Sequence, residues 1–270
     1  MKNQNILTQN GVDLTKGLEL FGDIEMYNES LGDFMAEVDG KLYKIAHFKE
    51  TNDMPNYAIL VHSLKSDAKY FGFTKLAEFS YAHELEAKAN NTVFVNENYE
   101  SLMTEANRIV AMVKEYLNSN TTVPTVQVSV ADTPSVSVQE PPIPIDQNMK
   151  SILVVDDSEI INNFVHRIFT GIYNVLTALD GAEAIKIIES TPGISAMLLD
   201  LNMPNVDGFK VLEYMKEKDL FKILPVSIIT GNDSKEIDQN AFAYPIIDIL
   251  KKPFTDSSIK TIVERTMGFQ

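Results

Sequence analysis

The 270-residue chain contains no cysteine, and this absence excludes disulfide bonds and thiolate metal sites. It also lacks an apolar run of about 18 residues, so the sequence predicts no membrane span. Residues 1–5 lead into no apolar signal segment, which favours a cytoplasmic location. The formal net charge is −15, and an acidic chain is poorly suited to binding the phosphates of nucleic acids.

Glycine is sparse as well, with 12 residues, and none of them forms a glycine-rich phosphate-binding loop. The sequence therefore shows no ATP-binding kinase segment, and it shows no helix-turn-helix segment for DNA. The composition, with 44% hydrophobic and 23% charged residues, is that of a soluble globular protein. This length allows one large domain or two ordinary domains, each with its own core.

Residues 1–118 have the apolar spacing of amphipathic helices. Apolar residues recur at steps of three and four over 12–22, 24–48, 55–71, 75–89 and 96–117. Residues 51–53 supply an N-cap for the third of these helices, and Thr74 can cap the fourth. The short connections predict an antiparallel helical bundle over residues 1–118.

Residues 119–149 differ from what precedes them. They are rich in proline, serine and threonine and have no helical period, which predicts a flexible linker. A stray edge strand over residues 126–130 is the alternative.

From residue 150 to residue 270, predicted strands alternate with predicted helices. The strands are 151–155, 173–178, 195–200, 224–230 and 246–250, and the helices are 158–170, 181–190, 207–218, 234–242 and 255–267. This alternation predicts an α/β domain with a five-stranded parallel sheet covered on both faces. The expected strand order is the flavodoxin-like 2-1-3-4-5.

Polar side chains mark the ends of four predicted strands. They are Asp156 and Asp157 after the first strand, Asp200 at the end of the third, Thr230 at the end of the fourth, and Lys252 after the fifth. The carboxyl ends of parallel strands meet at one edge of a sheet, so these side chains should gather there. Three neighbouring carboxylates repel one another unless a cation is present, and Mg²⁺ is a hard ion that carboxylates bind.

This set resembles the receiver domain of two-component response regulators over residues 150–270. The resemblance implies that Asp200 is the phosphoacceptor and forms an aspartyl phosphate. The Mg²⁺ ligands that it implies are Asp156, Asp157, Asp200 and the backbone carbonyl of Asn202. Lys252 would pair with the phosphoryl oxygens, and Thr230 would hydrogen-bond to one of them. Receivers often have an aromatic residue three positions before the lysine, where this chain has Ile249.

One predicted helix of the bundle carries a second candidate site. His62, Lys65, Ser66 and Lys69 share one helical face, because they lie at i, i+3, i+4 and i+7. An imidazole in open solvent can attack phosphorus, and the two lysines would offset the new negative charge. The motif resembles the histidine-containing phosphotransfer (HPt) domain, with Ser66 where many members have glycine. An ordinary surface histidine is the alternative.

Together these features predict a phosphorelay protein. We expect it not to be an enzyme, except that the receiver would catalyse its own phosphorylation and dephosphorylation. It would carry a phosphoryl group between His62 and aspartate sites, with a sensor histidine kinase and other receiver or HPt proteins as partners. Two other classes stay open. One is an interaction scaffold with a receiver fold, and the other is a phosphatase of the haloacid dehalogenase type. That phosphatase family has a second acid two residues after its nucleophile, where this chain has Asn202.

Overall fold

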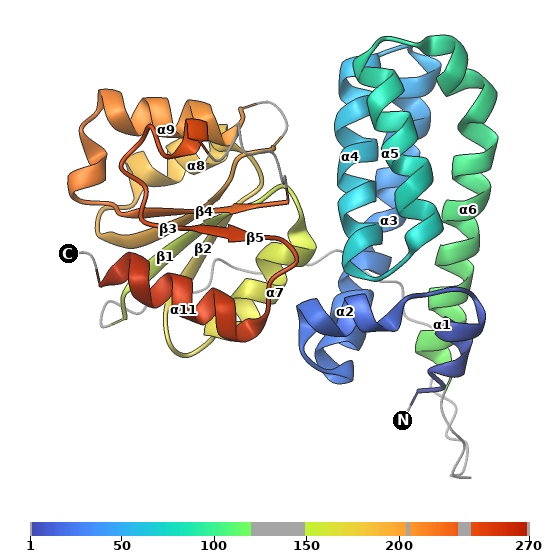
Figure 1. The fold of residues 1–270 in the computed structure, drawn as a ribbon, viewed down its shortest axis with the longest axis horizontal. Coiled ribbons are helices and arrows are strands. Elements are labelled where there is room, and N and C mark those ends of the chain that lie inside the picture. The colour runs from blue at the N-terminus through green and yellow to red at the C-terminus, as the bar shows by residue number, and fades with distance from the viewer. Residues whose placement is uncertain (1, 120–148, 204–205, 232–238, 269–270) are drawn as a thin grey trace, which may run out of the picture.

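The computed structural model describes residues 2–119, 149–203, 206–231 and 239–268. The predicted linker over 119–149, apart from its two end residues, and most of the predicted helix over 234–242 lie outside the described residues. The chain forms a helical part (residues 2–119) and an α/β part (residues 149–268), which stand side by side (Figure 1). None of the described helices is both long enough and apolar enough to cross a membrane.

Six helices make up the helical part, which confirms that this region is all helical. They are α1 (Asn5–Gln9), α2 (Leu14–Phe21), α3 (Ile24–Glu50), α4 (Met54–Tyr70), α5 (Thr74–Lys88) and α6 (Thr92–Asn118). The five predicted helices match α2 to α6 to within a few residues. Helix α1 escapes prediction because its five residues are too few to show a helical period.

Local interactions set the boundary between α4 and α5. Asp53 caps α4 as predicted, since its carboxylate accepts a hydrogen bond at 3.2 Å from a backbone N–H of the first turn. The prediction that Thr74 caps α5 is wrong, because Thr74 is the first helical residue and the N-cap is the buried Phe73. Gly72 between the helices has a φ of +73°, and a Cβ there would lie 2.1 Å from the carbonyl oxygen of Asp13. Only glycine fits this turn.

An aromatic cluster fixes the orientation of α4 in the bundle. The ring of Phe71, directly after the helix, lies 5.2 Å from the ring of Phe21 and 5.6 Å from that of Phe34. Buried ring pairs of this kind stabilise a fold by about 0.5–1.5 kcal/mol beyond their burial. With this aromatic cluster inside the bundle, the face of α4 that carries His62 is directed toward the α/β part.

The α/β part contains the predicted sheet, with all strands parallel and in the order β2-β1-β3-β4-β5. The strands are β1 (Ser151–Val155), β2 (Asn174–Ala178), β3 (Ile194–Asp200), β4 (Val226–Thr230) and β5 (Ile249–Lys251). The helices are α7 (Glu159–Phe169), α8 (Gly181–Ser190), α9 (Gly208–Glu217), the 3₁₀-helix η1 (Leu220–Lys222) and α11 (Asp256–Met267). The last strand is shorter than predicted and begins three residues later.

Different helices cover the two faces of the sheet. Ile152 and Val154 cluster with apolar residues of α7 and α11, whereas Leu153 and Val155 cluster with those of α8 and α9. Successive strand residues point to opposite faces, so a fully apolar strand indicates a sheet buried on both sides. Figure 1 shows α7 and α11 on one side of the sheet and α8 and α9 on the other.

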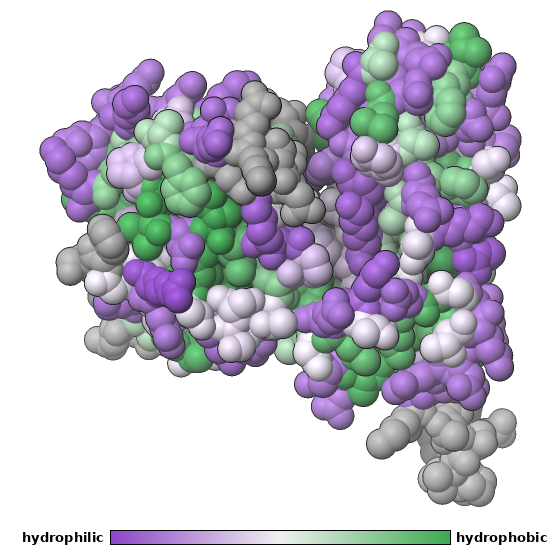
Figure 2. Space-filling model, viewed as in Figure 1, coloured by the Kyte–Doolittle hydropathy of each residue, from purple (hydrophilic) through white to green (hydrophobic). Residues whose placement is uncertain are grey.

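Helix α7 joins the α/β part to the bundle. The ring of Phe164 meets that of Phe21 edge-on at 5.4 Å, and one apolar cluster extends across both parts. The guanidinium of Arg167 pairs with the carboxylate of Asp33 at 2.9 Å and donates a hydrogen bond to Ser30 Oγ at 2.8 Å. These contacts hold α4 opposite the carboxyl edge of the sheet. The face drawn in Figure 2 is mostly hydrophilic, as the charged composition predicts.

A buried polar contact ties α4 to the loop after β1. Asp67 on α4 is 1% exposed and forms an ion pair with Lys41 on α3. Its second oxygen accepts a hydrogen bond from Ser158 Oγ at 3.4 Å. Because Ser158 directly follows Asp157, this contact fixes α4 against the candidate acidic residues.

Candidate active site

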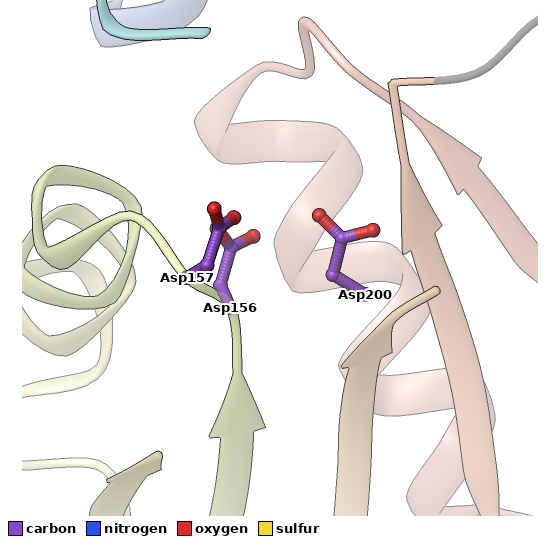
Figure 3. Close-up of side chains that lie close together, drawn as sticks. All are labelled: Asp156, Asp157 and Asp200. Atoms are coloured by element: carbon purple, nitrogen blue, oxygen red, sulfur yellow. The ribbon is translucent and has the colours of Figure 1, made fainter. Parts of the chain in front are cut away.

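The acidic residues predicted at the strand ends lie together. Strands β1 and β3 are neighbours, and Figure 3 shows Asp156 and Asp157 at the end of one strand with Asp200 opposite them on the other. One carboxylate oxygen from each of the three residues lies within 4.8 Å of the other two. Asp156 and Asp200 are buried, and Asp157 is half-buried.

Backbone groups orient two of the three carboxylates. The N–H of Ser158 donates to Asp156 Oδ1, and the N–H of Asn202 donates to Asp200 Oδ1, each at 3.0 Å. Gly208, the first residue of α9, packs against the same segment. A Cβ at Gly208 would lie 2.2 Å from the carbonyl oxygen of Asp200, so only glycine lets α9 begin this close to the end of β3.

Lys252 lies against the acidic cluster. Its Nζ is 2.5 Å from Asp156 Oδ2 and 2.5 Å from Asp200 Oδ2, and its side chain is 6% exposed. Burial opposes the charged form, but the carboxylates of Asp156 and Asp200 outweigh it and raise the pKa of Lys252 well above its usual range. Lys252 is therefore a fixed cation beside Asp200.

The carboxylates respond to the same surroundings. Burial raises the pKa of Asp156 to about 6, with Asp200 adding to the rise and Lys252 opposing it. Burial and the charges of Asp156 and Asp200 raise the pKa of Asp157 well above its usual range. Lys252 is thus one positive charge beside three carboxylates. When all three are ionised, the cluster has an excess of negative charge that raises the pKa values of Asp156 and Asp157.

This donor set fits a hard divalent cation. Three carboxylate oxygens are the kind of ligands that Mg²⁺ takes from protein, with water and phosphate completing its shell. Asp156 Oδ2 accepts no hydrogen bond of good geometry, although Lys252 Nζ lies close by. This buried oxygen can therefore still bind a cation. The backbone of Asn202 lies beside Asp200, as its N–H contact shows.

The remaining strand-end residues lie where the sheet predicts. Thr230 is fully buried at the end of β4, and its carbonyl accepts a hydrogen bond from the N–H of Lys252 at 2.9 Å. Ile249, three positions before Lys252, is half-buried and packs against the apolar cluster beneath α8 and α9. Strand β5 therefore presents an aliphatic residue at that position.

The surroundings of the second candidate site differ from the sequence prediction. His62 is not in open solvent, since its side chain is 24% exposed, and its Nδ1 lies 2.7 Å from Glu84 Oε1 on α5. The same carboxylate binds Lys65 Nζ at 2.5 Å and Lys88 Nζ at 2.6 Å. Of the two lysines predicted to offset the new negative charge, Lys65 is therefore already paired with Glu84, and Lys69 is exposed.

Glu84 determines the proton position on the imidazole. Although burial opposes its ionisation, hydrogen bonds from His62, Lys65 and Lys88 hold the pKa of Glu84 far below its usual range. An ionised carboxylate only accepts hydrogen bonds, so the Nδ1–H of His62 donates to it. Lys65 Nζ also lies 3.2 Å from Nδ1, but its shorter contact is with Glu84. The lone pair of the ring is then on Nε2.

The two candidate sites line one cavity. Its volume is about 490 Å³, and residues from both sites form its wall: His62, Lys65, Ser66 and Lys69 from α4, and Asp200, Asn202 and Lys252 from the α/β part. A second cavity of about 550 Å³ is lined by His62 together with Asp157 and Asn202. Docking of the bundle on α7 thus places the imidazole and the acidic cluster beside the same open cavity.

The sequence interpretation missed Glu84, Lys88 and Tyr70, which also line this cavity. Glu84 and Lys88 are spaced i, i+4 on α5, a pattern that usually indicates a solvated ion pair. Their relation to His62 depends on how α4 and α5 pack, and the sequence carries no local signal for it.

Comparisons with known proteins find relatives of the α/β part. A profile of the family described as "Response regulator receiver domain" matches residues 152–264. The chemotaxis protein CheY1 of Helicobacter pylori is 30% identical over 121 residues, which are 43% of this chain and 96% of that protein. A response regulator of Rickettsia bellii described as NtrX-like is 32% identical over 117 residues. These are 42% of this chain and 24% of that protein, so the chain spans about a quarter of the NtrX-like relative.

Two solved structures are similar to part of this chain. The chemotaxis response regulator CheY4 of Vibrio cholerae is 28% identical, with a TM-score of 0.41, over 44% of this chain and 98% of that one. CheY in a CheX–CheY–BeF₃–Mg²⁺ complex from Borrelia burgdorferi is 29% identical, with a TM-score of 0.39, over 43% of this chain and 87% of that one.

The fold and the strand-end carboxylates define a signalling domain of the two-component type. Through this C-terminal domain, the chain belongs to the response regulator receiver family.

Proposed function

We propose that the chain is a phosphorelay protein in which a phosphoryl group passes between His62 and Asp200 of the same molecule. In this proposal residues 1–118 act as an HPt-like domain and residues 150–270 as the receiver domain, joined by the segment 119–149. The observation that carries the proposal is the cavity of about 490 Å³, which His62 and Asp200 line together.

The imidazole is prepared for this transfer. With Nδ1–H bound to Glu84, a phosphoryl group on Nε2 makes the ring a cation, and the carboxylate stabilises that cation. A carboxylate oxygen of Asp200 then attacks phosphorus, the P–N bond breaks, and its electron pair returns to Nε2. The ring leaves as neutral imidazole and Nδ1 keeps its proton, so the step needs no proton transfer.

The receiver residues stabilise the product. Asp156, Asp157, Asp200 and the backbone carbonyl of Asn202 would hold Mg²⁺, and the bound ion supplies positive charge for the phosphoryl oxygens. Lys252 would exchange its contact with Asp200 for one with a phosphoryl oxygen, since the attacked carboxylate loses its charge. The hydroxyl of Thr230 would donate a hydrogen bond to another oxygen.

External partners would feed or drain this internal pair. A sensor histidine kinase in the cytoplasm would phosphorylate one of the sites, and other receiver or HPt proteins would exchange with it. A transient docking suits such a carrier, because both sites must become accessible to partners in turn.

The test uses labelled acetyl phosphate and the full chain with Mg²⁺. We expect a base-labile label on Asp200 and an acid-labile label on His62, with the ratio of the two independent of protein concentration. Asp200→Asn should remove both labels, and chelating the metal should do the same. His62→Gln should leave only the label on Asp200. Full labelling of Asp200→Asn, or transfer whose rate rises in proportion to protein concentration, would contradict transfer within one molecule.

A further inference from the structure

Tyr70 extends from the bundle into the receiver site. It is the last residue of α4, about two turns beyond His62, and it is 6% exposed. It lines the cavity of about 490 Å³ together with Asp200 and Lys252. The charged groups that affect its hydroxyl most belong to the receiver domain: Lys252, Asp156, Asp200 and Asp157.

The hydroxyl of Tyr70 remains a neutral donor. Burial raises the pKa of Tyr70 well above its usual range; Lys252 opposes this rise and the neighbouring carboxylates add to it. Within the described ranges, no hydrogen bond is formed by this hydroxyl, whereas the buried hydroxyls of Tyr27 and Tyr57 bind Phe71 and His83. The residue lines the cavity and its hydroxyl is not sealed in the core, so it can donate a hydrogen bond to an acceptor that enters the cavity.

We propose that Tyr70 donates a hydrogen bond to the phosphoryl group on Asp200, so that the bundle completes the receiver's phosphate site. This inference rests on Asp200 being the phosphoacceptor. The phosphoryl oxygens are the anionic acceptors that the cavity would receive after transfer, and Lys252 and Tyr70 both line this cavity.

The contact links the chemistry on Asp200 to the docking of the two domains. The phosphoryl group on Asp200 can bind Tyr70 only when α4 lies against the edge of the sheet. By linkage, phosphorylation then strengthens docking as much as docking stabilises the aspartyl phosphate. The contact of Lys252 with the phosphoryl group does not depend on docking, since this residue belongs to the receiver domain itself.

The experiment measures binding of beryllium fluoride, a phosphoryl analogue, to the full chain with Mg²⁺ by calorimetry. Tyr70→Phe keeps the ring and removes only the donor, and the loss of a hydrogen bond to a charged group should weaken binding by about tenfold or more. Tyr81→Phe is the matched control, because Tyr81 lines the same cavity but is 51% exposed, and we expect its affinity to equal that of the unaltered chain.

The outcomes separate the two proposals. If the unaltered chain binds the analogue and Asp200→Asn does not, the phosphoacceptor is established independently of Tyr70. Equal affinities of the unaltered chain and Tyr70→Phe would then overturn the role of Tyr70 alone. If the unaltered chain does not bind, or Asp200→Asn binds as tightly, both the proposed function and this inference are wrong. Equal melting temperatures of the two tyrosine variants without fluoride show that packing is retained.

Discussion

Replacing Glu84 with glutamine tests whether this residue prepares His62 for transfer. The variant keeps a carbonyl oxygen for Nδ1–H but removes the charge that binds His62, Lys65 and Lys88. A hydrogen bond to a charged group contributes about 1.5–3 kcal/mol, whereas a neutral one contributes about 1 kcal/mol. Lys88 is largely exposed, so its pair contributes little.

The buried contacts therefore determine the magnitude. Weakening the His62 contact and leaving the mostly buried Lys65 without a counter-ion should lower the free energy of unfolding by about 2 kcal/mol. Loss of the charge that stabilises the phosphorylated imidazolium should slow transfer by about tenfold, equivalent to about 1.4 kcal/mol. Labelling of Asp200 by acetyl phosphate should not change, because Glu84 does not contact the acidic cluster.

The shifted pKa of Glu84 also predicts how the stability difference between the unaltered chain and Glu84→Gln changes with pH. The pKa of Glu84 in the fold lies below its value in the unfolded chain, which is about 4.3. The carboxylate therefore stabilises the fold fully above that unfolded value, and the stabilisation is lost as the pH falls through the folded value. The difference between the unaltered chain and Glu84→Gln should be complete at pH 7 and should shrink below about pH 4.

The assay combines urea unfolding, followed by circular dichroism at several pH values, with the rate of label transfer from His62 to Asp200. Glu78→Gln, on an exposed position of the same helix, is the control and should behave as the unaltered chain. Transfer at the normal rate in Glu84→Gln would refute the argument that Glu84 holds the proton on Nδ1 and so makes Nε2 the reacting nitrogen. A stability difference that persists unchanged at pH 3 would refute the charge argument.

Two further predictions concern the receiver domain and its docking. Lys252→Ala should impair phosphorylation of Asp200 far more than Lys251→Ala, because Lys252 Nζ lies 2.5 Å from Asp200 Oδ2, and equal label in mass spectra of the two variants would contradict this. Arg167→Ala removes the ion pair and hydrogen bond that α7 makes with α3. It should lower the unfolding free energy by about 1 kcal/mol and slow transfer within the chain. X-ray scattering should show a larger radius of gyration, and an unchanged radius and rate would mean that Arg167 does not hold the two parts together.

The sequence by itself determined most of the α/β fold. Strands of the receiver domain are short apolar runs, and the positions of Asp156, Asp200 and Thr230 at their ends follow from the same pattern. Because parallel strands end at one edge, a local pattern was enough to bring these residues together. The bounds of β1 and α8 agree with prediction residue for residue.

The same reasoning gave less where local signals are weak. Helix α1 is too short to show a period, and the start of α5 is decided by burial of Phe73 rather than by a polar cap. Strand β5 has apolar residues before it that read as strand, although pairing with β4 in the sheet covers only three residues.

Only the tertiary structure decided how the two sites relate. Glu84 reaches His62 from another helix, and Tyr70 reaches Lys252 from a different part of the chain. Helical spacing describes the face on which His62 and Lys65 lie, but not which groups the neighbouring elements bring to it. The docking of α7 on α2 through Phe164, and on α3 through Arg167, turns that face toward Asp200. Such contacts depend on the packing of elements far apart in the sequence, for which neither periodicity nor spacing carries information.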